Sequence, residues 1–363
     1  MPTTDEFDEL PVKPKSIQHF STIKADLLKN QNLIRTKGVV PYDQNIVQLK
    51  HSENNVDFIN ASWVNIVQTS DGVYDLPVLH PYLPSSMIGL ISAQSPLENT
   101  IDQHVQMLYE AKVGLVVEVS QNASMNGGEK FDGAIVSKKL IDKMDLNDML
   151  TREVWDLSKE RGKTRRLVFL QLKDWANSGE LSEVTIHNML TTITQARKDI
   201  GNTRETMTLL VQDEQGGVGG AAVFIALLQL LEKIDDAVIA AKSHVGKFEE
   251  DDFTINVFET IQDLRCKRMG MIQSLEEYTF LHQALLHYVK NKEQYDDLLK
   301  QRQDYLSSDD PAPTRPEQQT QNEIEDEYVL HNPENEEPHE YLDEHKVYDN
   351  EGGVYVNDNM YLE

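Results

Sequence analysis

The chain has 363 residues, 39% of them hydrophobic, which is enough for one large domain with extensions. Its formal net charge of -27 argues against nucleic acid and anionic membranes as partners. The single cysteine excludes a disulfide framework, and the sequence shows neither a signal peptide nor the roughly 18 apolar residues of a membrane span. We therefore expect a cytoplasmic protein.

Residues 1–24 contain the segment PVKPK and are predicted to be a linker that runs into a short helix at 16–31. From 25 to 292, apolar runs of strand length alternate with segments of helical periodicity. The predicted strands lie at 113–120, 166–172 and 208–211, and the predicted helices at 101–112, 184–200 and 256–268. This alternation predicts an α/β fold with a twisted, mixed and largely parallel sheet flanked by helices.

The most informative stretch, residues 207–234, is a strand-like run, a glycine-rich turn and a helical apolar run. A strand, tight loop and helix present backbone N–H groups and a helix N-terminus to an anion, and phosphate is the natural guest. Here the turn carries Asp213 and Glu214, and it has no Cys, Lys or Arg. The candidate phosphate loop comprises Gln212, Asp213, Glu214, Gln215, Gly216, Gly217, Val218, Gly219 and Gly220.

The same turn also matches a dinucleotide fingerprint, because the segment from Gly217 to Ala222 satisfies G-x-G-x-x-A between a strand and a helix. A dinucleotide-binding unit needs a second parallel strand that ends in an acidic residue about 20 residues later. Asp235 and Asp236 follow the turn, but the sequence around them, DDAVIAAK, has helical character. This interpretation is disfavoured, and we expect no cofactor and no metal.

The character of the sequence changes toward the C-terminus. Residues 293–316 are expected to hold the end of a helix and a polar linker. Residues 317–363 contain fifteen acidic residues against one basic residue, Lys346, which predicts a disordered acidic tail. The three histidines of this tail are expected to be solvated rather than metal-binding: His331, His339 and His345.

Five tyrosines lie in the acidic tail, where tyrosine is usually scarce: Tyr328, Tyr341, Tyr348, Tyr355 and Tyr361. Acid-flanked tyrosines resemble substrates of tyrosine kinases, and Tyr355-Val356-Asn357 matches the pattern Y-x-N that adaptor-type Src-homology-2 domains bind. Phosphorylation would add up to about two negative charges at each site. The alternative is that these tyrosines are simply solvated or pack back on the domain.

Further blocks of sequence occur at 41–50 (PYDQNIVQLK), 57–64 (DFINASWV), 93–100 (AQSPLENT), 172–179 (LKDWANSG) and 269–289 (MGMIQSLEEYTFLHQALLHYV). In their order and spacing they resemble the motifs of the protein tyrosine phosphatase family. These are P-Y-D-x-x-R-V-x-L, D-Y-I-N-A-S, T-Q-G-P-L-x-x-T, the W-P-D loop and the glutamine-bearing C-terminal segment. The glycine-rich turn is similar to the family loop H-C-x-x-G-x-x-R-[ST]-G. The resemblance implies a tyrosine-phosphatase-like domain over residues 25–292.

The resemblance implies a catalytic thiolate and a phosphate-binding Arg in this loop, and neither is present. Counting forward from Gln212, which stands for the family His, Asp213 replaces the Cys and Gly219 the Arg. Counting back from the helix, Glu214 replaces the Cys and Gly220 the Arg. Either alignment loses both groups, and the only cysteine, Cys266, lies outside the loop.

The other functional positions of the family are also altered. Asn177 stands where the family has its Asp general acid, and Thr36 and Gly38 stand where it has the ring-stacking Tyr and the backbone-binding Asp. The water-positioning glutamine is retained as Gln273. A carboxylate about 4 Å from a phosphate charge repels it by about 4 kcal/mol at an effective dielectric of 20. We therefore expect neither hydrolysis nor tight phosphotyrosine binding.

The loop pattern V-x-D-E-x-G-G-V resembles the inactive membrane-distal second domain of receptor tyrosine phosphatases of the zeta/gamma group and their insect relatives. This implies a regulatory or docking domain whose partners include an active membrane-proximal phosphatase domain, at the inner face of the plasma membrane. The alternatives are a residually active phosphatase and a phosphotyrosine reader that does not hydrolyse. For the loop itself, we expect one carboxylate either to fold into the ring of N–H groups or to point to solvent.

Overall fold

The computed structural model describes residues 4–11, 20–50, 57–64, 87–120, 130–173, 175, 182–202, 207–243 and 255–300. All of these residues belong to one compact unit, residues 1–309, and residues 310–363 form the second unit. Among the described residues, no helix has the length and apolar character that crossing a membrane requires.

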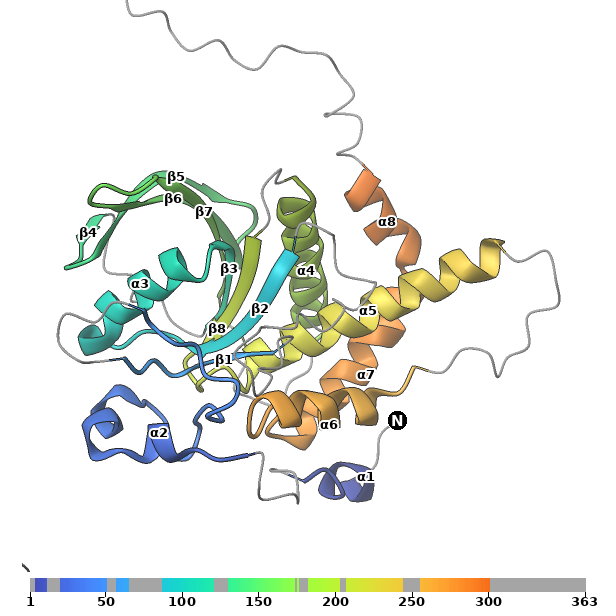
Figure 1. Cartoon of the computed structure of the whole chain (residues 1–363). Helices are drawn as coiled ribbons and strands as arrows, with labels where there is room; N and C mark the ends of the chain where they lie inside the picture. Colours follow the sequence, from blue (N-terminus) through green and yellow to red (C-terminus); the bar gives the residue numbers. More distant parts are fainter. Residues whose placement is uncertain are drawn as a thin grey trace, which may run out of the picture. The chain divides into compact units, whose positions relative to one another are not determined.

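A single eight-stranded sheet, in the order β1-β2-β8-β3-β7-β6-β5-β4, forms the centre of the domain (Figure 1). The pairs β2–β8, β8–β3 and β3–β7 are parallel, whereas β1–β2 and the three pairs from β7 to β4 are antiparallel. The strands are β1 (Ala61–Trp63), β2 (Met87–Gln94), β3 (Val113–Val119), β4 (Lys130–Asp132), β5 (Val136–Asp145), β6 (Leu150–Lys159), β7 (Arg165–Leu172) and β8 (Met207–Asp213).

Helices cover both faces of the sheet (Figure 1). One face packs against α4, α5, α6 and α7 in the largest apolar cluster, and the other packs against α3. The helices are α1 (Thr4–Asp8), α2 (Ile23–Asp26), α3 (Ile101–Glu110), α4 (Glu183–Asn202), α5 (Gly220–Ser243), α6 (Val257–Lys267), α7 (Leu275–Lys290) and α8 (Lys292–Lys300), with 3-10 helices η2 (Leu28–Leu33) and η3 (Glu98–Thr100).

The alternation of side chains along the central strands divides the core between the two faces. In β8, Leu209 and Val211 belong to the cluster on the α5 side, whereas Leu210 belongs to the cluster on the α3 side. Because both faces are covered, β8 is buried along its whole length. The first turns of α5 are equally buried, so the turn between β8 and α5 is held at both ends by the core.

The mixed sheet flanked by helices confirms the predicted fold class, and every strand and helix predicted between 101 and 268 is present. Among the strands that the structure describes, four pairs are antiparallel and three are parallel, so the expectation of a largely parallel sheet is wrong. α5 continues through Asp235 and Asp236 to Ser243, so the second strand that a dinucleotide unit requires is not found there.

The N-terminal residues differ from the expected linker and helix. Instead of one helix over 16–31, the described part of this range contains the four-residue α2 and the start of η2. The two are separate because Leu27 between them is extended, with ψ of 134°. Upstream, α1 packs on α7: the Tyr278 hydroxyl donates to Glu6 (2.8 Å), and the Phe7 and Tyr278 rings lie 5.7 Å apart. A buried Arg265 also donates to the carbonyl of Leu10. Residues 4–10 are therefore part of the domain.

Candidate functional site

The glycine-rich loop lies at the carboxyl end of β8, where the chain turns into α5. Gly216 and Gly217 adopt positive φ angles of 91° and 79°, which a side chain would oppose. Close packing adds to this requirement, because a Cβ on Gly217 would lie 2.5 Å from Ser92 Oγ. The Ser92 hydroxyl instead donates to the carbonyl of Gly217 at 2.6 Å. These contacts fix the backbone so that N–H groups point into the loop.

The carboxylate of Asp213 occupies the centre of this loop. Its Oδ1 accepts the backbone N–H of Gly217 at 2.5 Å, and its Oδ2 accepts those of Gly219 and Ala221, each at 3.0 Å. Ala221 lies in the first turn of α5, so the carboxylate also caps this helix and meets its positive dipole end. One of the two arrangements expected from the sequence is therefore observed: the acid is folded into the ring of donors.

Burial and hydrogen bonding act on Asp213 in opposite directions. The side chain is 2% exposed, and this burial raises the pKa of Asp213 above its ordinary value. The three N–H donors and the nearby Arg268 guanidinium oppose the rise, because they favour the ionised form. The carboxylate is thus a fixed part of the loop rather than a group exchanging with solvent.

Arg268 binds the loop from the side opposite to the N–H groups that Asp213 contacts. Its fully buried guanidinium donates to the carbonyl of Gly216 through Nε (3.0 Å) and Nη2 (2.6 Å), and also to Ser62 Oγ and Asn60 Oδ1. Burial lowers the pKa of Arg268 to about 10, so the group remains a cation at neutral pH. This arginine binds the back of the loop, and its donors are directed to protein acceptors rather than to a ligand.

Glu214, the other acid that the sequence singled out, is half-exposed and lies in the turn beyond β8. Its neighbour Asp213 is the last residue of β8, and the carbonyl of Asp213 accepts the N–H of Ser95. Only Asp213 is buried at the position that faces the N–H groups. This geometry favours the forward alignment, in which Asp213 and Gly219 occupy the positions of the family Cys and Arg.

The space beside Gly219 and Gly220 is already filled. A Cβ on Gly219 would overlap with Gln215 Oε1. A Cβ on Gly220 would lie 2.8 Å from Nε1 of Trp175, whose ring packs edge-on against Phe280 with centroids 5.0 Å apart. An arginine at either glycine would therefore have to displace packed side chains.

Glu277 is a third acid beside the loop, and it was not among the residues singled out from the sequence. Its Oε1 would lie 3.2 Å from a Cβ on Gly219, and burial raises the pKa of Glu277 to about 7, with Asp213 adding to the rise. Glu277 also accepts the N–H of Gln273, while Ser274 accepts the N–H of Glu277. The sequence signal was the pattern S-L-E-E, which marks a helix start and does not reveal that the helix start faces the loop.

Gln212, which the sequence aligns with the family His, is hydrogen-bonded to a buried histidine. Its Oε1 lies 2.7 Å from His104 Nε2, and both side chains are buried. Burial lowers the pKa of His104 to about 4, so its imidazole is neutral at physiological pH. This pair contributes a hydrogen bond beneath the loop and no charge.

The remaining predicted positions differ in how they relate to the loop. The segment with Thr36 and Gly38 reaches the loop through Val39, whose Cγ1 would lie 2.6 Å from a Cβ on Gly216. The segment with Gln273 reaches the loop through Ile272, whose N–H donates to the carbonyl of Val218. Thr36 and Gln273 are exposed. Outside the described residues lie Asn177, the five tail tyrosines, the three tail histidines and the segments 301–316 and 317–363.

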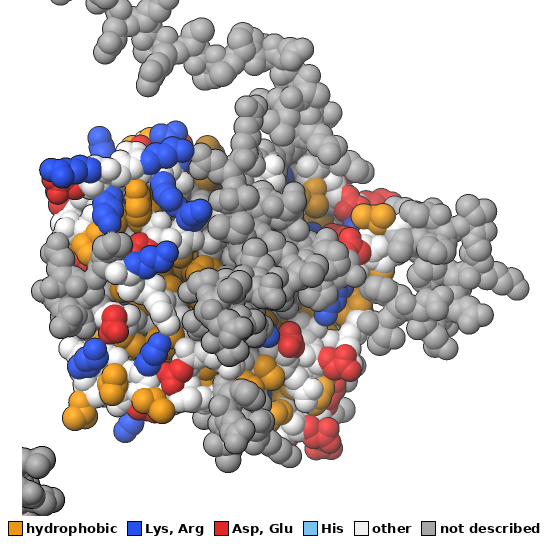
Figure 2. Space-filling view, in the orientation of Figure 1, with side chains coloured by type: hydrophobic (Ala, Val, Ile, Leu, Met, Phe, Trp, Pro, Cys, Tyr) orange, Lys and Arg blue, Asp and Glu red, His pale blue; other side chains and the backbone are white. Residues whose placement is uncertain are grey.

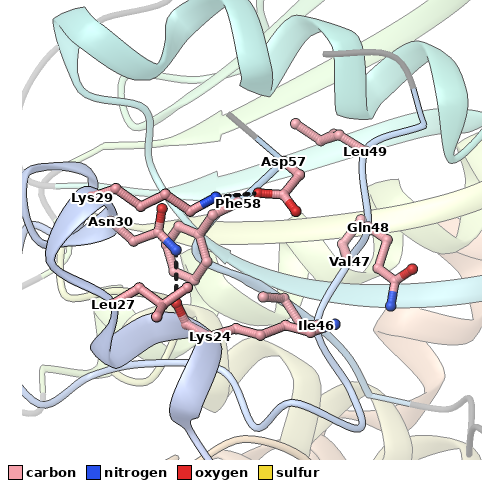
Figure 3. A pocket seen from close by; sticks show the side chains of 10 residues that line it. All are labelled: Lys24, Leu27, Lys29, Asn30, Ile46, Val47, Gln48, Leu49, Asp57 and Phe58. Atoms are coloured by element: carbon pink, nitrogen blue, oxygen red, sulfur yellow. Dashed lines mark hydrogen bonds and ion pairs between the residues drawn. The ribbon is translucent and has the colours of Figure 1, made fainter. Parts of the chain in front are cut away.

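A hollow of about 160 Å³ lies elsewhere, on the N-terminal segment (Figure 3). Leu27, Ile46 and Phe58 line it, and Lys29 pairs with Asp57 at 3.2 Å on its rim. None of the residues of the glycine-rich loop lines this hollow. Among the described residues, no group of three or more His, Cys, Asp or Glu side chains is placed to hold a metal ion.

Comparison with known proteins agrees with the resemblance. The family model for protein-tyrosine phosphatase matches residues 30–287. A solved structure, "Structural basis of PTPN18 fingerprint on distinct HER2 tyrosine phosphorylation sites", aligns with a TM-score of 0.57 at 20% identity. That alignment covers 73% of this chain and 86% of the solved chain, and it shows the shared fold.

Curated relatives include receptors. Phosphatidylinositol phosphatase PTPRQ of Homo sapiens is 28% identical over 306 residues, covering 79% of this chain and 11% of the relative. Receptor-type tyrosine-protein phosphatase alpha of Mus musculus is 22% identical, with 75% and 30% covered, and receptor-type tyrosine-protein phosphatase C of Homo sapiens is 26% identical, with 78% and 22% covered. The matched part of the chain thus spans less than a third of the length of each of these relatives.

Proposed function

The chain belongs to the protein-tyrosine phosphatase family, and we propose that its phosphatase domain is catalytically inactive and acts as a regulatory and docking module in phosphotyrosine signalling. One observation carries the proposal: the Asp213 carboxylate accepts the backbone N–H groups of Gly217, Gly219 and Ala221. These are the groups that a phosphate would need. A phosphate could enter only by displacing a carboxylate that is covalently part of the loop.

The chemistry of the loop supports inactivity as well. Phosphoryl transfer to the protein needs a nucleophile, and the thiolate of the family is replaced by a carboxylate whose oxygens are both engaged in hydrogen bonds. It also needs a cation on the equatorial phosphate oxygens. The position of that cation is Gly219, next to which Gln215 and the acidic Glu277 lie.

Docking is proposed with an active phosphatase domain, as in a membrane-distal second domain of a receptor at the inner face of the plasma membrane. The supporting observations are the loop pattern V-x-D-E-x-G-G-V and the receptor-type relatives. The tail tyrosines add a proposed second route, in which phosphorylated Tyr355 binds an Src-homology-2 adaptor. That route rests on the sequence alone.

A turnover assay on a phosphotyrosine peptide, with the catalytic domain of an active relative as control, tests the proposal. We expect no hydrolysis above that of an Asp213→Ala variant. Hydrolysis by the wild-type chain that survives this substitution would overturn the proposal and require another nucleophile. Calorimetry with the same peptide tests the alternative function, a domain that binds phosphotyrosine without hydrolysing it. A saturable heat of binding without turnover would make the domain such a phosphotyrosine reader.

The docking part is tested separately by co-purification of the full chain with the membrane-proximal domain of a receptor phosphatase, and we expect a complex. A matched chain in which the five tail tyrosines are changed to Phe, treated with a tyrosine kinase, shows whether adaptor binding needs the tail. If the kinase-treated wild-type chain binds an adaptor no better than the Phe chain, the adaptor route is wrong.

A further inference from the structure

The turn between β6 and β7 concentrates positive charge in a strongly acidic chain. Five of the eight residues from Lys159 to Arg166 are basic, namely Lys159, Arg161, Lys163, Arg165 and Arg166, against one acid, Glu160. Figure 2 shows Lys and Arg side chains gathered over the part of the molecule in which Figure 1 places β5 and β6. A local field of this kind attracts anions even when the net charge of the whole protein is -27.

The turn is held rigidly against the end of α3 by Tyr109. The Tyr109 hydroxyl donates to the carbonyl of Lys163 at 2.9 Å, and the Arg165 guanidinium lies 4.9 Å from the centre of the Tyr109 ring. Gly162 permits this approach, because a Cβ there would lie 2.7 Å from Tyr109 Oη. A surface fixed in this way loses little conformational entropy when it binds.

Lys112 extends the basic surface. It follows the last turn of α3, and its side chain is exposed. In the sheet, Leu115 of β3 pairs with Val168 of β7, three residues beyond Lys112 and Arg165 respectively, so the register places both cations at the same edge of the sheet. We call the set Tyr109, Lys112, Lys159, Arg161 and Arg165 the α3–turn surface.

Three cations of the α3–turn surface have no ion pair with another residue that the structure describes. Arg166 pairs with Asp156 at 3.1 Å. Among the described residues, however, no carboxylate forms an ion pair with Lys112, Lys159 or Arg161. Within the part of the chain that the structure describes, Lys112 and Arg161 are exposed and Lys159 is half-buried, so these cations can be reached by an anionic ligand.

We propose that the α3–turn surface binds a short acidic segment of a partner protein. The guanidinium fork of Arg161 matches a carboxylate, and the half-buried Tyr109 ring, which lies next to the Arg165 guanidinium, offers an apolar contact within the same surface. A short peptide meets only the local cations, because interactions beyond about 8 Å are screened at physiological salt. A membrane or a nucleic acid is extended and would meet the acidic remainder of the chain.

The proposal is independent of the inactivity of the glycine-rich loop. The loop follows the carboxyl end of β8, whereas the turn precedes the amino end of β7, and both strands run parallel to β3. The two sites thus lie at opposite ends of the parallel strands, the loop at the carboxyl ends and the turn at the amino ends. A peptide bound at the α3–turn surface leaves the loop unchanged, and turnover at the loop would say nothing against the surface.

The test uses the full chain and a fluorescent eight-residue peptide of Glu and Asp with one central Tyr, with binding followed by anisotropy at two salt concentrations. The test variant is Lys112→Glu/Arg161→Glu. The control, Lys24→Glu/Lys290→Glu, changes two other exposed lysines and shifts the net charge equally. We expect the test variant to bind at least about tenfold more weakly, the control to match the wild type, and affinity to fall with salt.

Equal binding by the wild type and the test variant, or no binding by the wild type, would overturn the proposal. So would an equal loss in the control, because the effect would then reflect net charge alone. Should the double charge reversal impair folding, the milder Lys159→Ala/Arg161→Ala variant is measured in its place. Tighter binding of anionic phosphatidylserine vesicles or duplex DNA than of the peptide, lost in the test variant, would assign the surface to those ligands and contradict our choice of partner.

Discussion

At the scale of single residues, two adjacent acids in the glycine-rich loop differ in burial and in what they contact. Asp213 and Glu214 could not be distinguished by the sequence, since either could align with the family nucleophile. Only the end of β8 decides which side chain points inward, and strand ends are the least predictable feature of a sequence. Because the carboxylate of Asp213 is buried and that of Glu214 is half-exposed, we expect the two acids to contribute very differently to the stability of the domain.

Replacing Asp213 by Ala removes the acceptor of three buried N–H groups, and we expect a loss of about 2–4 kcal/mol in the free energy of unfolding. The matched Glu214→Ala variant should change it by less than about 0.5 kcal/mol. Chemical denaturation of both variants provides the measurement. Similar losses in the two variants would show that the carboxylate of Asp213 does not hold the loop.

Gln215 fills the space beside Gly219, which predicts how an arginine at this position would affect stability. Gly219→Arg should destabilise the domain, because its side chain meets Gln215, and Gln215→Ala in the same chain should recover part of the loss. The melting temperatures of the single and double variants measure this coupling. Additive effects would indicate that Gln215 does not fill the space that the family gives to its arginine.

Glu277 provides a pH-dependent test. Because burial raises its pKa to about 7 in the folded state, its ionisation opposes folding. Stability that is fully present below the ordinary glutamate pKa is lost as the pH rises through about 7. We expect Glu277→Gln, which keeps the acceptor for Gln273, to leave the melting temperature unchanged at pH 4.5 and to raise it at pH 8. A rise of equal size at both pH values would contradict the assignment.

At the scale of elements, periodicity and strand-length apolar runs located β3, β7 and β8 and the helices α3, α4, α5 and α6, but not β2, which pairs with β8. No strand was predicted at β4, β5 or β6. β4 and β5 are exposed over much of their length and carry many charged residues, whereas β6 is mostly buried or half-buried but has charged residues at Arg152, Glu153 and Asp156. β-propensity depends on what a strand packs against, which the sequence does not specify. The same limit hid the basic turn between β6 and β7.

The attachment of α8 depends on a polar cluster that no local pattern predicts. Asp235 of α5 accepts from Arg197 of α4 (2.9 Å), from Tyr288 of α7 (2.8 Å) and from Lys292 of α8 (2.8 Å). The residues are far apart in sequence, and only the packing of four helices brings them together.

We expect Asp235→Ala to lower the free energy of unfolding by somewhat less than the about 3–5 kcal/mol that breaking a fully buried ion pair costs, because Asp235 is partly exposed. The neighbouring Asp236→Ala removes a charge of the same sign and serves as the control, with little change expected. Hydrogen exchange of the α8 amides supplies the second readout. Unchanged protection of α8 in Asp235→Ala would rule out this anchor.

At the scale of the whole molecule, the chain keeps the family scaffold, while its glycine-rich loop carries residues that differ from the family loop motif. The sheet, the covering helices and the strand–loop–helix unit are retained. The thiolate and the arginine of the loop are absent, and the loop is closed by Asp213 from inside and by Arg268 from behind. The sequence indicated the absence of each group and left open whether a carboxylate fills the loop. The three-dimensional packing decided that question, and it was also needed to find Glu277 and the blocked space at Gly219.

The Asp213 carboxylate already occupies the backbone donors that would bind phosphate. Titration of the isotopically labelled chain with inorganic phosphate, followed through the amide resonances of Gly217, Gly219 and Ala221, tests it most directly. We expect these resonances to stay fixed in the wild type up to millimolar phosphate and to shift in Asp213→Ala, in which the donors are free. Saturable shifts of the same amides in the wild type would contradict it.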